Sequence, residues 1–153
     1  MSSIDELINN EKLINKIQDS FDDERNEDLS ELTFSKIKSI KNDILQKLQL
    51  DKETLKDYHK KLKNYRYIDE INELKYGNFI RSINLNKETL EEIKLNNGGF
   101  LIDIKPTNDG IILTLRNRIN RIYSLKMNEN LIFQKLNEQE EIILTILSSK
   151  LIN

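Results

Sequence analysis

The chain has 153 residues, a length that fits one domain or a small domain with an appendage. Hydrophobic residues make up 37% of the chain and charged residues 33%, but most of the apolar residues are large leucines and isoleucines that can form a core. The chain has no cysteine, which excludes disulfides and the common cysteine-ligated zinc sites. No apolar run approaches the length of a membrane span, so we expect no membrane partner.

Charge is distributed unevenly, although the formal net charge is only −2. Residues 1–35 contain ten acidic and three basic side chains, whereas residues 36–66 contain ten basic and four acidic ones. The single proline and all four glycines, which mark turns, lie between residues 77 and 110. We therefore predict three parts: an acidic, partly helical segment over 1–32, a helical region over 33–75, and a small β-barrel with a C-terminal helix over 76–153.

Apolar residues at helical spacing mark the first half of the chain. An N-terminal helix is predicted to begin after Ser3, and the acidic stretch that follows it is typical of a solvated turn. A second helix is predicted to begin after Thr33 and a third after Asp51, because each side chain can cap a helix and precedes an apolar stripe. Residues 66–75 are interpreted as a short helical continuation. The lysines expected on the outer face of the second helix are Lys36, Lys38, Lys41 and Lys47.

Alternation with a period of two replaces the helical spacing from Tyr76 onward. Pro106, followed shortly by Asn-Asp-Gly, indicates a tight turn between strands. A C-terminal helix is predicted to begin after Asn137, with Glu140 completing a capping box. The five predicted strands lie within residues 77–85, 96–105, 111–117, 121–127 and 130–136. The predicted fold class is α+β: N-terminal helices, a five-stranded antiparallel barrel of the SH3-like or OB-like kind, and a C-terminal helix.

The strongest functional signal is the sequence LRNRINRIYSLK, residues 115–126. Three arginines fall within six positions at a predicted hairpin, and the planar guanidinium fork of arginine suits phosphate. A tyrosine beside them can offer a stacking face, as aromatic side chains do in proteins that bind single strands. The alternative is a hairpin tip that is polar because it faces water, with arginines that pair with nearby acidic side chains. The candidate nucleic-acid-binding residues are Arg116, Arg118, Arg121, Tyr123 and Lys126, with Arg81 as a neighbour.

A second candidate, KDYHKKLKNYRY at residues 56–67, interleaves basic residues with tyrosines. These tyrosines recur at the spacing of a helix core, so the alternative is a packed helix with a solvated outer face. His59 is the only histidine and is interpreted as a surface residue. The acidic run over 19–28 lacks the spacing of an EF-hand, and NNGGF lacks the lysine of a P-loop. We expect no catalytic residue, no metal site and no cofactor.

Two stretches, KLKNYRYIDEINELKYGNFIRSINL and NGGFLIDIK with the later GIILTLRN and IFQKL, carry a family resemblance. They resemble small uncharacterised proteins encoded by nucleocytoplasmic large DNA viruses. The resemblance covers roughly residues 60–136. It implies a viral origin and a location in the host cytoplasm or in a virion, and it implies no mechanism.

Two function hypotheses follow from these observations. The first is a non-enzymatic nucleic-acid-associated module that binds the phosphates of DNA or RNA through the arginine-rich hairpin. The second is a protein-interaction or assembly module, for example a viral structural or accessory protein, in which the barrel and the amphipathic helices bind another protein or a second copy of the chain. An enzyme is the weakest hypothesis, because no cluster of carboxylates or histidine can be assembled from neighbouring motifs.

Overall fold

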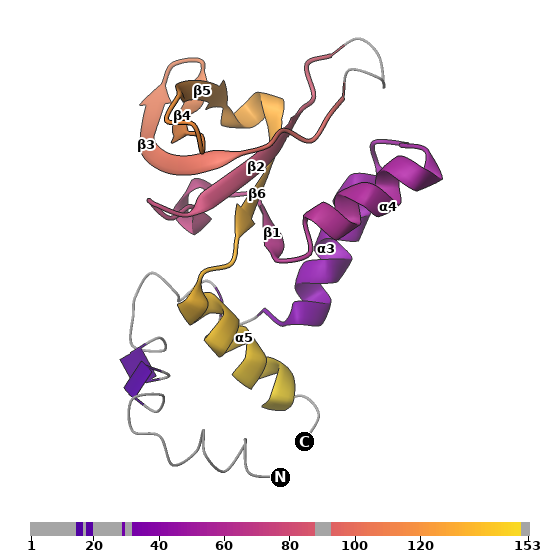
Figure 1. Ribbon diagram of the computed structural model, residues 1–153, viewed down its shortest axis with the longest axis vertical. Helices are drawn as coiled ribbons and strands as arrows, with labels where there is room; N and C mark the ends of the chain where they lie inside the picture. The colour runs from indigo at the N-terminus through magenta and orange to yellow at the C-terminus, as the bar shows by residue number, and fades with distance from the viewer. Residues whose placement is uncertain (1–14, 17, 20–28, 30–31, 88–92, 151–153) are drawn as a thin grey trace. The chain divides into compact units, whose positions relative to one another are not determined.

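The computed structural model describes residues 15–16, 18–19, 29, 32–87 and 93–150 (Figure 1). The chain divides into two compact units, one formed by Met1–Ile37 with Asn137–Asn153 and the other by Lys38–Leu136. The predicted cap at Ser3 and most of the N-terminal helix and acidic segment lie outside the described residues.

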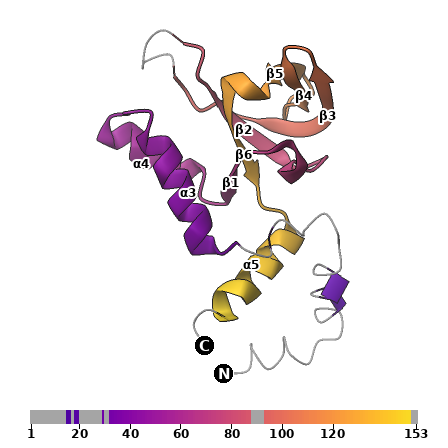
Figure 2. The same cartoon turned by 180° about the vertical axis from the view of Figure 1, so that it is seen from behind.

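Two helices, α3 (Phe34–Gln46) and α4 (Lys52–Lys61), confirm the predicted second and third helices and their caps. The Lys36 backbone N–H donates to Thr33 Oγ1 at 3.2 Å, and the Thr54 N–H donates to Asp51 Oδ1 at 2.8 Å. Each cap satisfies a backbone donor that has no partner within the helix. Along Lys38–Gln46, α3 lies beside α4 in both views of the molecule (Figures 1 and 2), and apolar side chains of both helices belong to one cluster.

Lys41 does not lie on the outer face of α3, so that part of the sequence interpretation is wrong. Its side chain is only 5% exposed, and its Nζ donates to the carbonyl oxygens of Leu62 at 2.7 Å and Lys63 at 3.3 Å. These carbonyls follow the C-terminus of α4, where backbone acceptors lack helical partners and a positive charge is favoured. Lys41 therefore ties α3 to the end of α4.

The strands form one antiparallel six-stranded sheet in the order β1-β6-β2-β3-β4-β5. The strand bounds are β1 (Tyr65–Ile68), β2 (Phe79–Asn84), β3 (Gly99–Thr107), β4 (Gly110–Arg116), β5 (Ile122–Lys126) and β6 (Asn130–Lys135). The predicted α+β class is confirmed, but the predicted five-stranded closed barrel is wrong in two respects. There is a sixth strand, β1, and within the described residues no pairing joins β1 to β5, so the sheet stays open.

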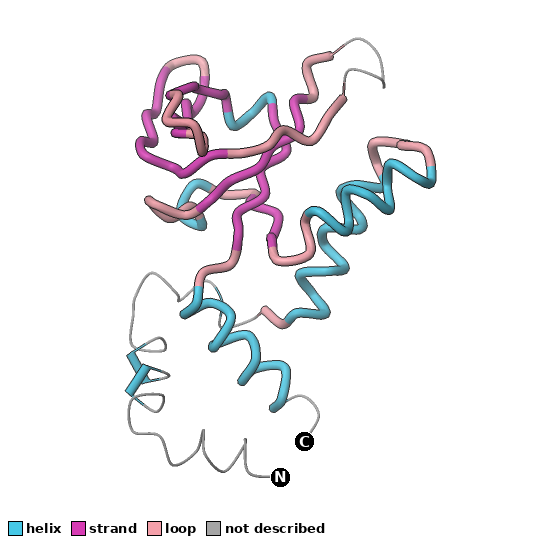
Figure 3. The backbone as a smooth tube through the Cα atoms, in the orientation of Figure 1, coloured by secondary structure: helices cyan, strands magenta, loops and turns pink. Residues whose placement is uncertain are grey.

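The sheet has a separate apolar cluster on each face. On one face, α3 and α4 cover β1, β2 and β6, and the buried residues are Leu45, Tyr58, Leu62, Tyr65, Phe79, Ile83 and Phe133. The buried residues of the opposite face are Ile68, Leu74, Ile80, Leu101, Leu113, Leu115 and Ile132. The long strand β3, which Figure 3 shows as a curved tube, has a register shift between Leu101 and Asp103, and a bulge of this kind bends a strand.

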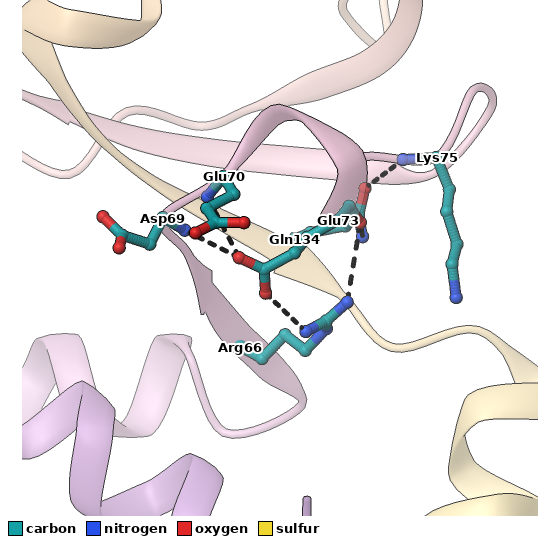
Figure 4. Close-up of polar contacts among 6 residues, drawn as sticks. All are labelled: Arg66, Asp69, Glu70, Glu73, Lys75 and Gln134. Atoms are coloured by element: carbon teal, nitrogen blue, oxygen red, sulfur yellow. Dashed lines mark hydrogen bonds and ion pairs between the residues drawn. The ribbon is translucent and has the colours of Figure 1, made fainter. Parts of the chain in front are cut away.

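The segment that was predicted as a helix over 66–75 is instead strand β1 followed by a 3₁₀ turn, η2 (Ile71–Glu73). A buried polar cluster holds this turn (Figure 4). Arg66 Nη1 donates to Glu73 Oε2 at 3.0 Å, Gln134 Nε2 donates to the Glu73 carbonyl at 3.1 Å, and the other Glu73 oxygen accepts from the backbone of residues 69 and 70. Pairing with β6, which lies far away in the sequence, replaces the local helical preference.

The C-terminal helix α5 (Glu138–Lys150) belongs to the other unit, and its predicted capping box is confirmed. The Glu140 N–H donates to Asn137 Oδ1 at 2.9 Å, and the Asn137 N–H donates to Glu140 Oε1 at 3.0 Å. Ile143 and Leu144 are buried. Among the described residues, no helix combines the length and the apolar character of a membrane span.

Candidate nucleic-acid interface

The arginine-rich segment forms the hairpin between β4 and β5, and Asn117 organises its loop. The Asn117 Oδ1 atom accepts hydrogen bonds from the N–H groups of Ile119 at 3.1 Å and Arg121 at 2.9 Å. The Asn117 N–H in turn donates to the Arg121 carbonyl at 2.9 Å. Asn120 takes a φ of 64°, in the left-handed region that asparagine tolerates better than most residues. The loop therefore has a defined backbone conformation, which fixes the positions from which the side chains of Arg118 and Arg121 extend.

Arg118 does not project from the tip of this hairpin but lies against the sheet. Its Cζ atom is 4.7 Å from the centroid of the Phe79 ring in β2. Phe79 also packs edge to face with Phe100 of β3, with ring centroids 4.9 Å apart and an angle of 81° between the rings. A guanidinium over an aromatic face is attracted by the electron density of the ring, so this contact holds Arg118 in place.

Arg81 and Arg118 line the same cleft, which has a volume of about 470 Å³. The other lining residues are Asn97, Gly98, Asn117 and Ile119. Arg81 Nε donates to the Asn96 carbonyl at 2.8 Å, which orients the guanidinium, and among the described residues its two terminal nitrogens have no hydrogen-bond partner. The volume falls within the range of ligand-binding pockets in proteins.

Gly98 allows the floor of this cleft to lie close to β2. A Cβ at this position would lie 2.6 Å from the Ile80 carbonyl oxygen and 2.6 Å from a ring carbon of Phe79. The φ of Gly98 is +91°, which also favours glycine. The NNGGF sequence, which lacks the lysine of a P-loop, thus contributes to the site through this close approach.

The positive charges of the hairpin are not neutralised within the described part of the chain. There, no carboxylate lies within ion-pair distance of the arginine side chains at 81, 116, 118 or 121, and the ion pairs that occur lie elsewhere. The charges of both cleft arginines also affect Tyr65. Burial raises the pKa of its phenol, and the charges of Arg81 and Arg118 offset part of that rise. The prediction that the arginines pair with nearby acidic side chains is therefore not supported for the described residues.

Arg116 lies in a row of side chains that crosses the sheet beside the cleft. Cross-strand partners share a face, and Phe79 pairs with Phe100, Phe100 with Arg116, and Arg116 with Ile122. Phe79 is covered, but Phe100 is 43% exposed and Ile122 is 60% exposed. The face that α3 and α4 bury over β1, β6 and β2 thus becomes an exposed surface over β3, β4 and β5. We call the exposed part, Phe100, Arg116 and Ile122, the exposed row.

Two predicted binding residues lie apart from Arg81, Arg118 and Arg116. Tyr123 pairs with Leu115 on the opposite face and packs against the second apolar cluster, and burial raises the pKa of its phenol. Lys126 lies at the far end of β5, where its Nζ is 4.0 Å from Glu129 Oε1. Arg121 is exposed where the loop meets β5. The structure therefore assembles Arg81, Arg118 and Arg116, but not Tyr123 or Lys126.

In the second candidate, residues 56–67, the tyrosines pack in the core, as the alternative interpretation expects. Tyr58 and Tyr65 are buried in the cluster between the helices and the sheet. His59 is half-buried rather than a surface residue, and within the described residues its Nε2 has no hydrogen-bond partner. Burial lowers its pKa, and the charges of Lys41 and Lys38 lower it further. No group of three or more metal-ligating side chains occurs among the residues that the structure describes.

No protein-family model matches the chain, and comparison with curated proteins and with solved structures found no match either. The resemblance to viral proteins therefore remains a prediction.

Proposed function

We propose that this chain is a non-enzymatic module that binds nucleic acid, with Arg81 and Arg118 holding a phosphate in their cleft and Arg116 adding attraction beside it. The proposal rests chiefly on two guanidinium groups that line one cleft without a carboxylate partner among the described residues. Like charges placed close together repel, so a site of this kind is stabilised when an anion enters it. Such a module would act in the cytoplasm, or in a virion if the chain is viral.

Phosphate suits this cleft better than a simple halide would, because it offers several oxygens to the two arginines. Arginine presents two parallel N–H groups that match two oxygens of one phosphate, and charge-assisted bonds of this type are among the strongest hydrogen bonds in proteins. The Arg118 guanidinium is already held against Phe79, and the Nε of Arg81 is already bonded. Binding therefore costs less side-chain entropy than it would for two mobile arginines.

The test is the fluorescence anisotropy of a labelled oligonucleotide of about 12 residues, measured at several salt concentrations between about 50 and 200 mM. We expect the affinity to fall as salt rises, because each neutralised phosphate releases counterions. Arg81→Gln and Arg118→Gln should each weaken binding and reduce the salt slope. Lys47→Gln, which removes an equal charge from an exposed position after α3, is the matched control and should leave binding unchanged. Binding that ignores ionic strength, or no binding at low salt, would contradict the proposal.

A second candidate function, a protein-interaction or assembly module, is favoured by the exposed apolar side chains around the arginines. Ile119 is 69% exposed in the hairpin loop and lines the cleft, and Phe100 and Ile122 of the exposed row are exposed as well. Apolar and aromatic side chains mixed with arginine are typical of the centre of a protein interface. Sedimentation velocity separates the two functions: a concentration-dependent dimer without oligonucleotide affinity supports assembly, and a monomer that binds oligonucleotides supports the first proposal.

A further inference from the structure

We infer that the nucleic acid bound at this site is single-stranded, with a phosphate between Arg81 and Arg118 and a neighbouring base stacked on the exposed side of Phe100. The inference rests on the proposed function and specifies its ligand. It identifies Phe100 as a binding residue that the sequence pattern does not single out.

The position of Phe100 supports this role. It is a large aromatic side chain on a strand, yet it is 43% exposed, next to an arginine on the neighbouring strand. The ring contacts Phe79 edge to face, and the residue is still 43% exposed. An aromatic ring on a sheet, flanked by positive charge, is the arrangement with which many proteins hold the bases of a single strand.

The separation of Phe100 from Arg118 has an upper limit that a nucleotide can span. The Phe100 ring centroid is 4.9 Å from that of Phe79, which is 4.7 Å from Arg118 Cζ, so the Arg118 guanidinium lies within about 10 Å of Phe100. That is roughly the reach of one nucleotide from its phosphate to its base. A phosphate in the cleft therefore brings a base of the same or the next nucleotide over Phe100.

A duplex fits this surface less well than a single strand. In a duplex the base faces are stacked on one another, so exposed apolar side chains such as Phe100 and Ile122 would lie against sugars and phosphates. A hairpin can enter the major groove of a duplex when its polar side chains project outward to the base edges. Arg118 instead lies back over Phe79, which removes the side chain best placed for that readout.

The neighbouring residues of the exposed row can cover the edge of the stacked base. Arg116 lies between Phe100 and Ile122 across the strands, so a base on Phe100 has a charge and an apolar side chain beside it. Every base has an aromatic face, and stacking does not depend on a particular set of hydrogen bonds. We therefore expect little sequence preference and binding of both DNA and RNA single strands.

The experiment measures anisotropy with four ligands of about 12 residues at low salt: a thymidine oligonucleotide, a uridine oligonucleotide, a duplex, and an abasic strand with the same phosphates. We expect both single strands to bind roughly tenfold more tightly than the abasic strand, and more tightly than the duplex. Phe100→Leu should weaken single-strand binding by roughly tenfold and leave abasic binding unchanged. Phe34→Leu, which removes a phenylalanine ring of similar exposure (41%) at the start of α3, is the matched control and should have no effect.

A second measurement does not depend on how well Phe100→Leu folds. The chain has no tryptophan, so Phe100→Trp introduces a single fluorescent reporter that keeps an aromatic ring at the site. Its emission should be quenched by the thymidine or uridine strand and should not respond to the abasic strand.

The outcomes separate the two proposals. If the duplex or the abasic strand binds as well as the single strands, or the tryptophan does not respond to bases, while Arg81→Gln still weakens binding, the single-strand inference is wrong and phosphate binding stands. If no oligonucleotide binds, the proposed function is wrong and the inference falls with it.

Discussion

Arg118, in the loop between β4 and β5, lies 4.7 Å from the ring of Phe79 in β2, which precedes it by almost forty residues. This contact joins the hairpin tip to the part of the sheet that α3 and α4 cover. It also places Arg118 in the same cleft as Arg81, which is two residues from Phe79 on the same strand. Alternate residues of a strand face the same side, so Arg81 lies on the same face of the sheet as Phe79, over which Arg118 lies. The candidate site depends on this geometry rather than on the number of arginines in the hairpin.

The loop geometry can be tested at Asn117. Asn117→Ala removes two hydrogen bonds to backbone N–H groups, and we expect the free energy of unfolding to fall by about 1–2 kcal/mol in urea denaturation. Oligonucleotide affinity should fall as well, because Arg118 is then less ordered. Asn120→Gly is the matched control: glycine accepts the positive φ, so its stability should change little. Equal losses for the two variants would show that Asn117 has no special part in the loop.

The close approach at Gly98 is tested by comparison with Gly77. Both residues have positive φ values, +91° and +83°, but only Gly98 has atoms within 4 Å of an added Cβ. Gly98→Ala should therefore destabilise the fold by clearly more than the roughly 1 kcal/mol of conformational strain expected for Gly77→Ala. Thermal unfolding of the two variants measures the difference. Similar melting temperatures for both would mean that the cleft floor adjusts without cost.

Buried Lys41 predicts a pH dependence of stability. Burial, and to a smaller extent the charge of Lys38, lowers its pKa from 10.5 to about 8. Between these two pH values the unfolded chain binds a proton that the folded chain does not, so the free energy of unfolding rises with pH. We expect the stability of the wild-type chain relative to Lys41→Met to increase from pH 8 to pH 10. A flat difference across this window would mean that Lys41 keeps its ordinary pKa.

The buried pair of Arg66 and Glu73 should contribute far more than a surface pair. The Arg66 side chain is only 3% exposed, so replacing its partner in Glu73→Gln weakens the compensation of a buried charge and should cost about 3 kcal/mol or more. Glu138→Gln disrupts the exposed pair with Lys16 and should cost less than about 1 kcal/mol. Urea denaturation of both variants gives the comparison. A cost for Glu73→Gln as small as that for Glu138→Gln would show that the turn η2 is held by its backbone contacts alone.

Features that depend on residues within a few positions of one another can be predicted without knowledge of the fold. The caps at Thr33, Asp51 and Asn137 and the turn after Pro106 follow from the hydrogen-bonding and φ preferences of single side chains. The arginines of the β4–β5 hairpin were recognised for the same reason, because their density is a local property.

Contacts between residues that are distant in the sequence depend on the folded arrangement of the strands. Strand β1 was missed because its four residues fit a helical spacing, and its pairing with β6 adds contacts that no local window contains. The sequence predicts Tyr123 as a stacking residue, because alternation along a strand does not say which face is buried. Arg81 and Phe79 reach Arg118, and Phe100 takes its place beside them, because three strands come together in one register. That register is set by burial and by backbone pairing across the sheet, which act between segments far apart in the sequence.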